Sequence, residues 1–361
     1  MSHANLHSRA VAALQSLYVG DALSMPVHWF YDRRDIAKAF PGGVKEMQAA
    51  PAHHPSSIMR LHSTSKGGRG SQASVPEKQI VGEVILRGKA KFWGVENQHY
   101  HQGMPAGENT LNAYCARLMT RGLAANNGNY DSARFLDEYI RFMTQDPPAH
   151  PDTYAESFHR GFFANLTAGK KANQCAAKTH DTPSVGGLVM IAPLAISQLV
   201  RELPLMGVQA TCREHLDLTH PDETLARVCD AYVELLYKLL FRSEEQALEP
   251  LLIEASHCIK GVGLAKILRG SAADASIVGG TFSTACYITD SWPSLLYLAA
   301  RYPNDVARAL IANTNLGGEN AHRGSVLGTI VGAAKGQGAT NLFSQLLHAE
   351  EIDREIEALL A

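Results

Sequence analysis

The sequence predicts an all-α fold, and three observations support this. Apolar residues recur three and four positions apart in segment after segment, which is the spacing of one face of an α-helix. Alternating apolar and polar runs bounded by turn residues are scarce, and the best example is Ile-Val-Gly-Gly at 277–280. No Ser/Gly linker, composition shift or internal repeat divides the 361 residues. We therefore predict one compact multi-helix domain over residues 1–361.

The helical spacing begins near the N-terminus and continues to the last residues. It is carried by Val11, Leu14 and Tyr18; by Leu111, Tyr114, Cys115, Leu118 and Met119; by Val228, Tyr232, Leu235, Leu236 and Leu239; and by Ile352, Ile356, Leu359 and Leu360. Residues at these spacings share one face of a helix, so each segment can bury an apolar stripe. Each segment is expected to be an amphipathic helix on a common core.

Residues 41–107 are the exception to this pattern. Gly, Pro, Ser and His dominate the segment, and the helical spacing lapses. Irregular segments of this length are uncommon inside a compact domain and are usually functional or mobile. We interpret the segment as a long irregular insertion, a loop or lid near the site. Two of its histidines, His99 and His101, are more typical of solvent-facing side chains than of metal ligands at this spacing.

Four glycines at four-residue spacing mark a helix near the C-terminus. Gly324, Gly328, Gly332 and Gly336 would share one face and form a smooth groove into which another helix can pack. Each glycine costs about 1 kcal/mol relative to Ala in an exposed helix, so close packing must offset that cost. This pattern predicts a central, buried helix.

Polar residues begin this helix and one other. Glu319, Asn320 and His322 follow the paired glycines Gly317 and Gly318. A second helix, after Pro105, begins in the same way with a Glu and an Asn. Unpaired N–H groups at a helix N-terminus favour anions and ligands, and two such starts suggest two halves of one site. The side chains that these two helix starts are expected to bring to one pocket are Glu108, Asn109, Glu319 and His322.

Composition excludes several classes of function. The 33 Lys and Arg against 35 Asp and Glu give a formal charge of -2 with no basic block, which argues against binding to nucleic acid or to a membrane surface. Six widely spaced cysteines without a C-x-x-C motif favour free thiols in a reducing cytosol. The N-terminal segment has no signal-peptide pattern, and the longest apolar run is too short to span a membrane. We expect a cytoplasmic protein whose partner is a small molecule or another protein surface.

Five segments in the same order resemble those of a known family. They are GDALSMPVHW (20–29), GENTLNAYCARLM (107–119), SVGGLVMIAPLAI (184–196), LTHPDETLARVC (218–229) and DSWPSLLYLAARYPNDVARALIANTNLGGENAHRGSVLGTIVGAA (290–334). Together they are similar to the ADP-ribosylglycohydrolases, a family that includes the dinitrogenase reductase activating glycohydrolase and the J1 crystallins. The resemblance implies a compact all-α domain and a hydrolase that cleaves a C1 glycosidic bond of an ADP-ribosyl or related ribosyl group. The substrate would be a small molecule or an ADP-ribosylated partner.

The resemblance also implies which residues face the substrate. Glu108 and Glu319 would be catalytic. The expected substrate-binding residues are His28, Asn109, Asn320, His180, Asp181, Gly186, Gly187, Gly317 and Gly318.

The metal-binding pattern of the family is altered in this chain. Family members usually hold two magnesium ions with a Thr-Asp-Asp-Thr turn, an Asp-x-Asp-Thr turn after paired glycines, and a Glu after the GDALG-x-P-x segment. Three of these carboxylate positions are here Asn109, Ala321 and His28, and the two that remain are Glu in place of Asp. Two Mg²⁺ ions need several oxygen anions in near-octahedral geometry. A binuclear magnesium centre is therefore not expected.

Three interpretations of the altered site stay open. A single divalent metal of the zinc, manganese or iron type could be held by Glu108, Glu319, His28 and His322. Alternatively the site is free of metal, with Glu108 and Glu319 as the carboxylate pair that glycoside cleavage commonly uses. The third interpretation is a non-catalytic ligand-binding or structural protein, as the crystallins of this family are.

A remote alternative is an HD-type phosphohydrolase. His180 and Asp181, in KTHDTPSVGG, form the His-Asp dyad that such all-α enzymes use for metal. That dyad normally lies within a helix, whereas Pro183 disfavours helical backbone at Thr182. The motif therefore gives this alternative little support.

Overall fold

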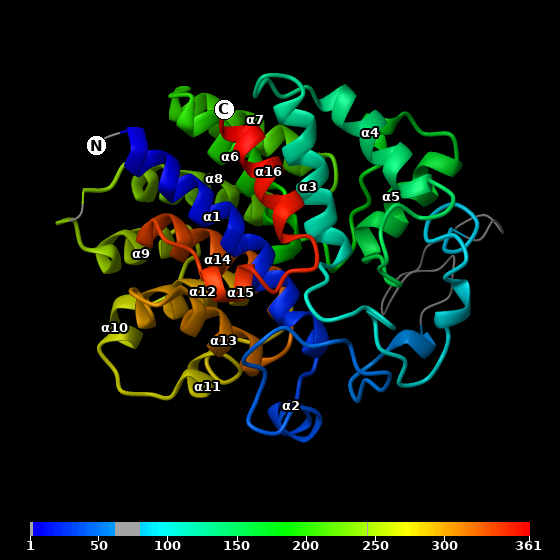
Figure 1. Ribbon diagram of the computed structural model, residues 1–361, viewed down its shortest axis with the longest axis horizontal. Helices are drawn as coiled ribbons and strands as arrows, with labels where there is room; N and C mark the ends of the chain where they lie inside the picture. Colours follow the sequence, from blue (N-terminus) through cyan, green and yellow to red (C-terminus); the bar gives the residue numbers. More distant parts are fainter. Residues whose placement is uncertain (1–2, 62–79, 244) are drawn as a thin grey trace.

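Helices α1 (His3–Ser24) and α14 (Asn320–Lys335) pack against each other at the centre of the protein (Figure 1). The structure is a computed structural model, and it describes residues 3–61, 80–243 and 245–361. A Cβ on Gly328 would lie 2.1 Å from the carbonyl oxygen of Ser16, so no side chain fits there. Gly324 and Gly332 face the α1 backbone in the same way. The predicted central helix with a glycine face is therefore confirmed.

The fourth glycine has a different role. Gly336 follows the last residue of α14 and has a φ of 69°, the left-handed conformation that commonly ends a helix. A Cβ there would meet only the Arg9 side chain, at 3.2 Å. The expectation that Gly336 belongs to the packing face is wrong, because the helix has already ended.

Other helices surround this pair. Those in contact with α14 are α13 (Val306–Leu316), α12 (Ile288–Arg301) and α8 (Glu223–Leu240), whereas α6 (Ile191–Val200), α3 (Leu111–Ala124) and α16 (Ala349–Leu360) pack on the α1 side. The remaining helices are α2 (Arg33–Ala39), α4 (Ser132–Thr144), α5 (Ser157–Thr167), α7 (Leu205–Asp217), α9 (Leu248–Ser256), α10 (Leu264–Leu268), α11 (Asp274–Ile277) and α15 (Thr340–Phe343). The amphipathic helices predicted from apolar spacing correspond to α1, α3, α8 and α16.

Strands are absent from the part of the chain that the structure describes. The segment most like a strand, 277–280, lies at the end of α11, where Val278 and Phe282 form only an isolated bridge. Short 3-10 helices occupy Met25–Val27 (η1), Met59–Leu61 (η2), Ala90–Phe92 (η3), Ala172–Gln174 (η4) and Val185–Leu188 (η5). The predicted all-α class is confirmed.

The predicted insertion, residues 41–107, has no α-helix in its described portions, and its residues 62–79 lie outside the described chain. It is nevertheless well packed, because Met59, Trp93 and Tyr100 belong to the hydrophobic core. His99 and His101 are also buried, so the expectation that they face solvent is wrong. The described part of the insertion thus supplies side chains to the interior.

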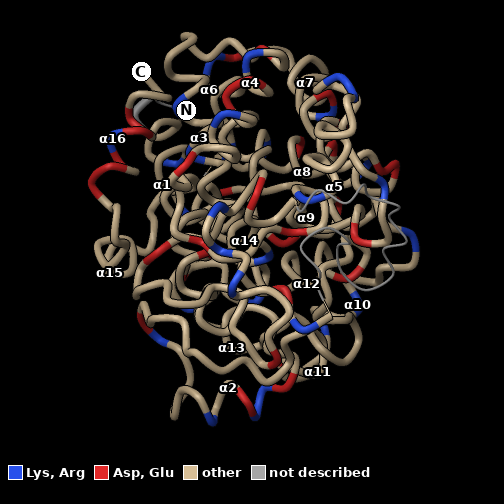
Figure 2. The backbone as a smooth tube through the Cα atoms, turned by 90° about the vertical axis from the view of Figure 1, so that its right-hand side faces the viewer, with Lys and Arg blue, Asp and Glu red and all other residues tan. Residues whose placement is uncertain are grey.

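Charged residues of both signs are interspersed along the backbone, as Figure 2 shows for one face of the protein. Among the helices of the described residues, none has the length and apolarity that a membrane crossing requires. All six cysteines are free thiols, four of them buried.

Candidate active site

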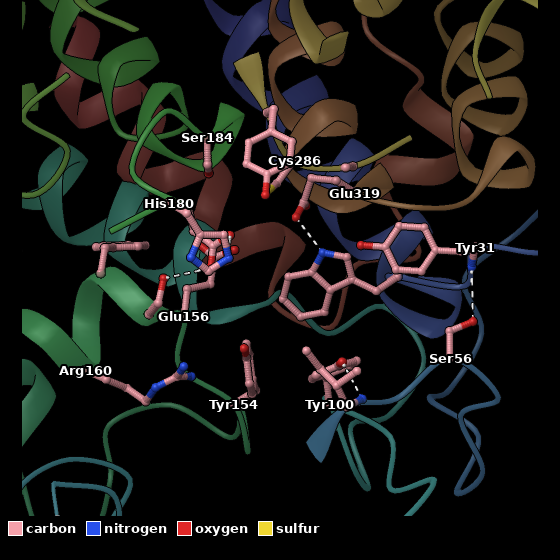
Figure 3. Close-up of a pocket in the computed structure, with 17 residues that line it drawn as sticks. Tyr31, Ser56, Tyr100, Tyr154, Glu156, Arg160, His180, Ser184, Cys286 and Glu319 are labelled. Atoms are coloured by element: carbon pink, nitrogen blue, oxygen red, sulfur yellow. Dashed lines mark hydrogen bonds and ion pairs between the residues drawn. The ribbon is translucent and has the colours of Figure 1, made fainter. Parts of the chain in front are cut away.

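A pocket of about 480 Å³ opens at the ends of several helices, within the usual size range for small-molecule sites. Aromatic side chains form much of its wall, and two carboxylates, those of Glu156 and Glu319, face into it (Figure 3). The aromatic lining residues are Trp29, Tyr31, Tyr100, Tyr154, Phe158 and Tyr287. The pocket therefore combines apolar rings with acidic groups.

Each carboxylate sits at the start of a helix. Glu156 is the N-cap residue of α5, and Glu319 is the N-cap residue of α14. Neither side chain caps its own helix through a hydrogen bond, so both carboxylates remain directed at other partners. The start of α3 lies beside them, because Asn112 in its first turn donates a hydrogen bond to Glu156 Oε2 at 3.1 Å. Three helix N-termini thus converge on one site.

The turn before Glu319 is fixed by close backbone packing. Gly318 has a φ of 65°, and a Cβ there would lie 2.1 Å from the carbonyl oxygen of Thr284. Beneath the turn, the buried Arg323 donates from Nη2 to the Gly317 carbonyl at 2.9 Å and from Nε to Asn313 Oδ1 at 2.7 Å. Burial lowers the pKa of Arg323 to about 10, which still leaves the guanidinium charged at neutral pH. Arg323 therefore holds the turn that presents Glu319.

Replacing Arg323 by Lys should destabilise the protein by about 1 to 3 kcal/mol, because one ammonium group cannot reach both acceptors and leaves a buried polar group unpaired. Urea unfolding of the purified variant would measure the loss. The exposed Arg269 provides a matched control, and Arg269→Lys should leave the midpoint unchanged. Equal stability of the two variants would show that Arg323 does not hold the turn.

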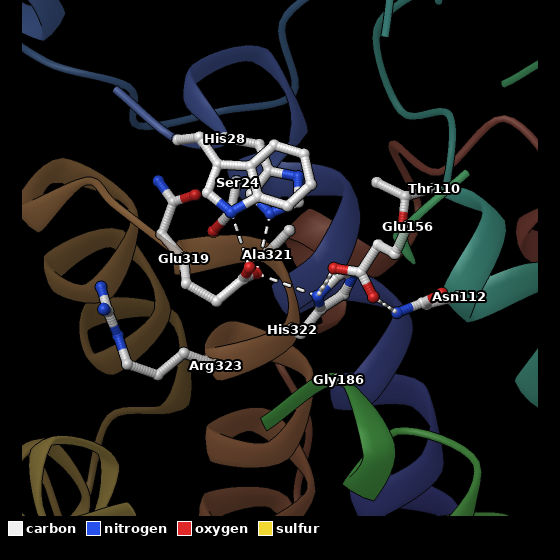
Figure 4. A network of polar contacts seen from close by, with 12 residues as sticks. Ser24, His28, Thr110, Asn112, Glu156, Gly186, Glu319, Ala321, His322 and Arg323 are labelled. Atoms are coloured by element: carbon white, nitrogen blue, oxygen red, sulfur yellow. Dashed lines mark hydrogen bonds and ion pairs between the residues drawn. The ribbon is translucent and has the colours of Figure 1, made fainter. Parts of the chain in front are cut away.

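Glu319 is surrounded by hydrogen-bond donors and positive charge (Figure 4). Its Oε1 lies 2.7 Å from His28 Nε2 and 2.9 Å from His322 Nδ1, and its Oε2 accepts from Trp29 Nε1 at 2.7 Å. Burial opposes ionisation of this carboxyl, but His322 and His28 outweigh burial and hold its pKa well below the ordinary value. Glu319 is therefore an ionised carboxylate at neutral pH.

A chain of buried side chains extends from His28. Its Nδ1 lies 2.8 Å from His101 Nε2, and His101 Nδ1 lies 2.9 Å from the Asp152 carboxylate. Burial lowers the pKa of His28 to about 3, so its ring is neutral, with Nε2–H donating to Glu319 and Nδ1 accepting. The His101 ring therefore lies between His28 and the Asp152 carboxylate and contacts both. The insertion therefore helps to orient His28.

Glu156 differs from Glu319 in its protonation. Burial is the main cause that raises its pKa to about 7, and repulsion from the Glu319 carboxylate adds to the shift. Gly186 leaves room for it, since a Cβ there would lie 3.1 Å from Glu156 Oε2. Glu156 can therefore gain or lose a proton near neutral pH while its neighbour stays ionised.

His322 lies between the two carboxylates. Its Nδ1 is 2.9 Å from Glu319 Oε1 and 3.4 Å from Glu156 Oε1. Both oxygens are therefore within roughly 6 Å of each other, less than the ~6.5 to 9.5 Å that leaves room for a water between two carboxyl groups. Burial opposes the charge on His322, but Glu319 and Glu156 together raise its pKa to about 10. The ring is therefore an imidazolium at neutral pH.

Comparison with known proteins agrees with this architecture. The sequence model of the ADP-ribosylglycohydrolase family matches residues 2–360 of this chain. The chain belongs to the ADP-ribosylglycohydrolase family. A solved structure described as an ADP-ribosylglycohydrolase-related protein complex has the same fold, with a TM-score of 0.61 and 20% identity over 99% of this chain and 98% of that chain. No curated protein matches the chain.

Because the chain belongs to the ADP-ribosylglycohydrolase family, we no longer consider an HD-type phosphohydrolase. His180 and Asp181 lie in a turn between η4 and η5 rather than within a helix, with His180 Nε2 at 3.0 Å from Asp181 Oδ1. Both residues line the pocket that contains Glu319. Their position is consistent with contact to a substrate, which stays a prediction.

The expected pairing of Glu108 with Glu319 is contradicted by the structure. Glu108 Oε1 accepts from Tyr114 Oη and from the Asn109 amide, each at 2.9 Å, and Oε2 lies 3.7 Å from His348. Glu108 does not belong to the lining of the pocket. The carboxylate that lines the pocket together with Glu319 is that of Glu156.

Two asparagines expected near the substrate donate to groups inside the protein. Asn109 donates to the Asp21 carboxylate and to the Tyr18 carbonyl, both at 2.9 Å. Asn320 donates to the carbonyl oxygens of Thr314 and Val27 beneath the pocket. Neither lines the pocket, because each amide joins helices that meet there.

The glycines divide in a similar way. Gly186 borders Glu156, whereas Gly187 packs against His220 and Leu225 in the core. Gly317 and Gly318 shape the turn before Glu319 and do not line the pocket. His28 and His322 lie behind the pocket around a second cavity of about 10 Å³. Both rings contact the Glu319 carboxylate, which lines the pocket.

The residues present do not fit the binuclear magnesium centre usual in the ADP-ribosylglycohydrolase family. Ala321 has no side-chain ligand atom, and Asn109 offers only a neutral amide oxygen in place of a carboxylate. For a single metal, the structure brings three of the four candidate ligands together, because donor atoms of His28, Glu319 and His322 lie within 4.8 Å of one another. Glu108 is not among them. The donor set is too small for two Mg²⁺ ions.

Sequence reasoning missed Glu156, Asp152 and Arg160. Glu156 stands directly before α5, as Glu319 stands before α14, so the same pattern of a Glu at a helix start could have identified it. Asp152 and Arg160 belong to the same short segment, PDTYAESFHRG. Its concentration of charged residues around a helix start was the available signal.

Proposed function

We propose that this protein hydrolyses a glycosidic bond at C1 of an ADP-ribosyl group or of a related ribosyl group. The proposal rests mainly on one observation: two carboxyl groups whose pKa values are shifted in opposite directions, Glu156 upward and Glu319 downward, line the same pocket. Glycoside cleavage needs one group that exchanges a proton and one negative charge near the sugar carbon. The family membership favours the same chemistry.

In the proposed reaction, Glu156 acts first as an acid. Its carboxyl proton passes to the departing atom while the bond between that atom and C1 breaks, and the bonding electrons leave with the departing group. Positive charge then develops on C1 and on the ring oxygen of the ribose. A water molecule bonds to C1, and Glu156, now a carboxylate, accepts the proton that the water releases.

Glu319 stabilises the positive charge in this scheme. Because His28, Trp29 and His322 contact its oxygens, the carboxylate is held in one orientation and stays ionised. A preorganised charge of this kind lowers the barrier without reorganisation during the reaction. The same contacts lower the basicity of Glu319, so we assign proton transfer to Glu156 alone.

The rest of the pocket suits a substrate with rings and negative charge. Trp29, Tyr100 and Tyr154 present aromatic faces or edges on which a base or a sugar can pack. Arg160 lines the same pocket and can attract an anionic group such as a phosphate. Burial raises the pKa of the Cys286 thiol well above its ordinary value, which argues against a cysteine nucleophile.

Release of free ADP-ribose tests the proposal. The purified protein would be incubated with ADP-ribosyl groups joined at C1 through nitrogen or through oxygen to a leaving group, and the products separated by chromatography. We expect release from at least one class of linkage, and no release from the same preparation carrying Glu156→Gln. Release that persists in that variant would come from a contaminant or from another site.

A non-catalytic binding protein is the second candidate, and one observation favours it. Both Glu319 oxygens are already occupied by hydrogen bonds, which is common for a structural carboxylate. In that case ADP-ribose would raise the thermal stability of the protein while no linkage is cleaved. Cleavage of any C1 linkage by the wild-type pocket rules this candidate out.

A further inference from the structure

The position of His322 between two carboxylates has a consequence for metal binding. His322 occupies the last place of the turn that is usually Asp-x-Asp-Thr in the family, and the first carboxylate of that turn, three residues earlier, is retained as Glu319. No acceptor is well aligned with Nδ1, although oxygens of Glu319 and Glu156 lie at 2.9 and 3.4 Å. The contact is therefore ionic, a charge shared between two carboxylates, rather than a directed hydrogen bond.

Such a cluster needs a positive charge. Two buried carboxylates close together repel each other, and an unpaired buried charge costs several kcal/mol. A divalent ion could supply the charge, as in family members that keep the three missing carboxylates, or a protonated side chain could supply it. Here His322 is almost wholly buried, and His28 Nε2 already donates to the Glu319 oxygen that a metal ion would share. The ion would have to displace one proton and overcome the charge of His322.

We propose that the His322 side chain is the built-in cation of this site and replaces the metal ions that other members of the family bind. It neutralises Glu319, orients that carboxylate toward the pocket and keeps Mg²⁺, Mn²⁺ and Zn²⁺ out of the site. The proposal does not depend on turnover, because it concerns the charge of the folded protein. Its success or failure can therefore be separated from that of the proposed reaction.

Metal binding to wild-type protein and to His322→Ala tests the proposal. The variant leaves two carboxylates beside Ala321 without their cation, so it should gain a saturable rise in melting temperature with MnCl₂ or MgCl₂. The wild type should show no saturable rise with MgCl₂, MnCl₂ or ZnCl₂. His257→Ala, at an exposed position, should behave like the wild type.

Further variants keep the test decisive. Glu319→Gln combined with His322→Ala should lose the gained response, because one carboxylate is then neutral. His322→Lys retains a positive charge and should fold without a metal response, which covers the case in which the Ala variant does not fold. A saturable rise in the melting temperature of His322→Lys with any of the three metal ions would contradict the proposal.

Two results would overturn the inference. The first is a stoichiometric metal in the purified wild-type protein, measured by elemental analysis and lost in His322→Ala, since His322 would then be a metal ligand. The second is a folded His322→Ala variant that responds to none of the three ions, because the two carboxylates would then form no cation site.

Discussion

Replacing Glu156 by Gln should lower kcat by roughly 10²- to 10⁴-fold, the usual contribution of a general acid or base. Gln keeps the size of the side chain and an oxygen that can accept from Asn112, so the fold should be retained. It cannot exchange a proton, and the departing group would leave without protonation. Rates of release of ADP-ribose by the two proteins would measure the effect, with the exposed Glu249→Gln as the matched control.

The pH dependence of this reaction follows from the pKa of Glu156. In the proposed reaction the acid form of Glu156 is the active one, and burial raises its pKa to about 7, so the rate should fall as pH rises through 7. The decline should be absent from the residual activity of Glu156→Gln. A rate that instead rises through pH 7 would assign Glu156 the role of a base in the first step.

Stability should change with pH in the same direction. The folded protein holds the Glu156 proton more tightly than the unfolded chain, whose carboxyl titrates at its ordinary value. The stabilising contribution is therefore complete below the ordinary pKa of Glu and is lost as pH rises to about 7. Glu156→Gln removes this dependence on pH. The free energy of unfolding of the variant, relative to that of the wild type, should therefore increase as pH rises from the ordinary pKa of Glu to about 7. Thermal unfolding across this pH range would measure the difference.

Replacing Gly328 by Leu should destabilise the protein by more than about 3 kcal/mol, beyond the usual cost of overpacking a core. Even the Cβ would lie 2.1 Å from the Ser16 carbonyl oxygen, which is backbone and cannot rotate away. Helices α1 and α14 would have to separate, and the turn that presents Glu319 lies directly before α14. Urea unfolding would measure the stability, and the rate of ADP-ribose release should fall in parallel.

Gly207 provides a control of the same chemistry. It lies in the first turn of α7, and a Cβ there would meet no atom within 4 Å. Gly207→Leu should therefore be neutral or should stabilise the helix by up to about 1 kcal/mol. If Gly328→Leu is as stable as Gly207→Leu, the close contact between α1 and α14 is wrong.

Local sequence patterns determined the fold class and the central helix. Apolar spacing predicted α1, α3, α8 and α16, because a helix that buries one face must repeat its apolar residues with the helical period. The glycines of α14 predicted close packing, since only helices in backbone contact offset the cost of several glycines. The polar start of α14 singled out Glu319 and the family resemblance singled out His28, and the structure places the two in contact.

The second carboxylate was decided by the tertiary structure alone. Glu108 and Glu156 both stand near a helix start, and nothing local distinguishes them. Glu108 turns toward Tyr114 and His348, whereas Glu156 turns toward the pocket. The direction of such a side chain depends on partners that the packing of distant helices brings near it.

The charges of the site depend on the same packing. His322 is a cation because two carboxylates from different helices approach its ring, and His28 is neutral because it is buried. His101 reaches His28 only because the irregular insertion folds inward. Sequence spacing determines which residues share a helix face, but burial and long-range contacts determine protonation, since both act through distances that only the folded chain sets.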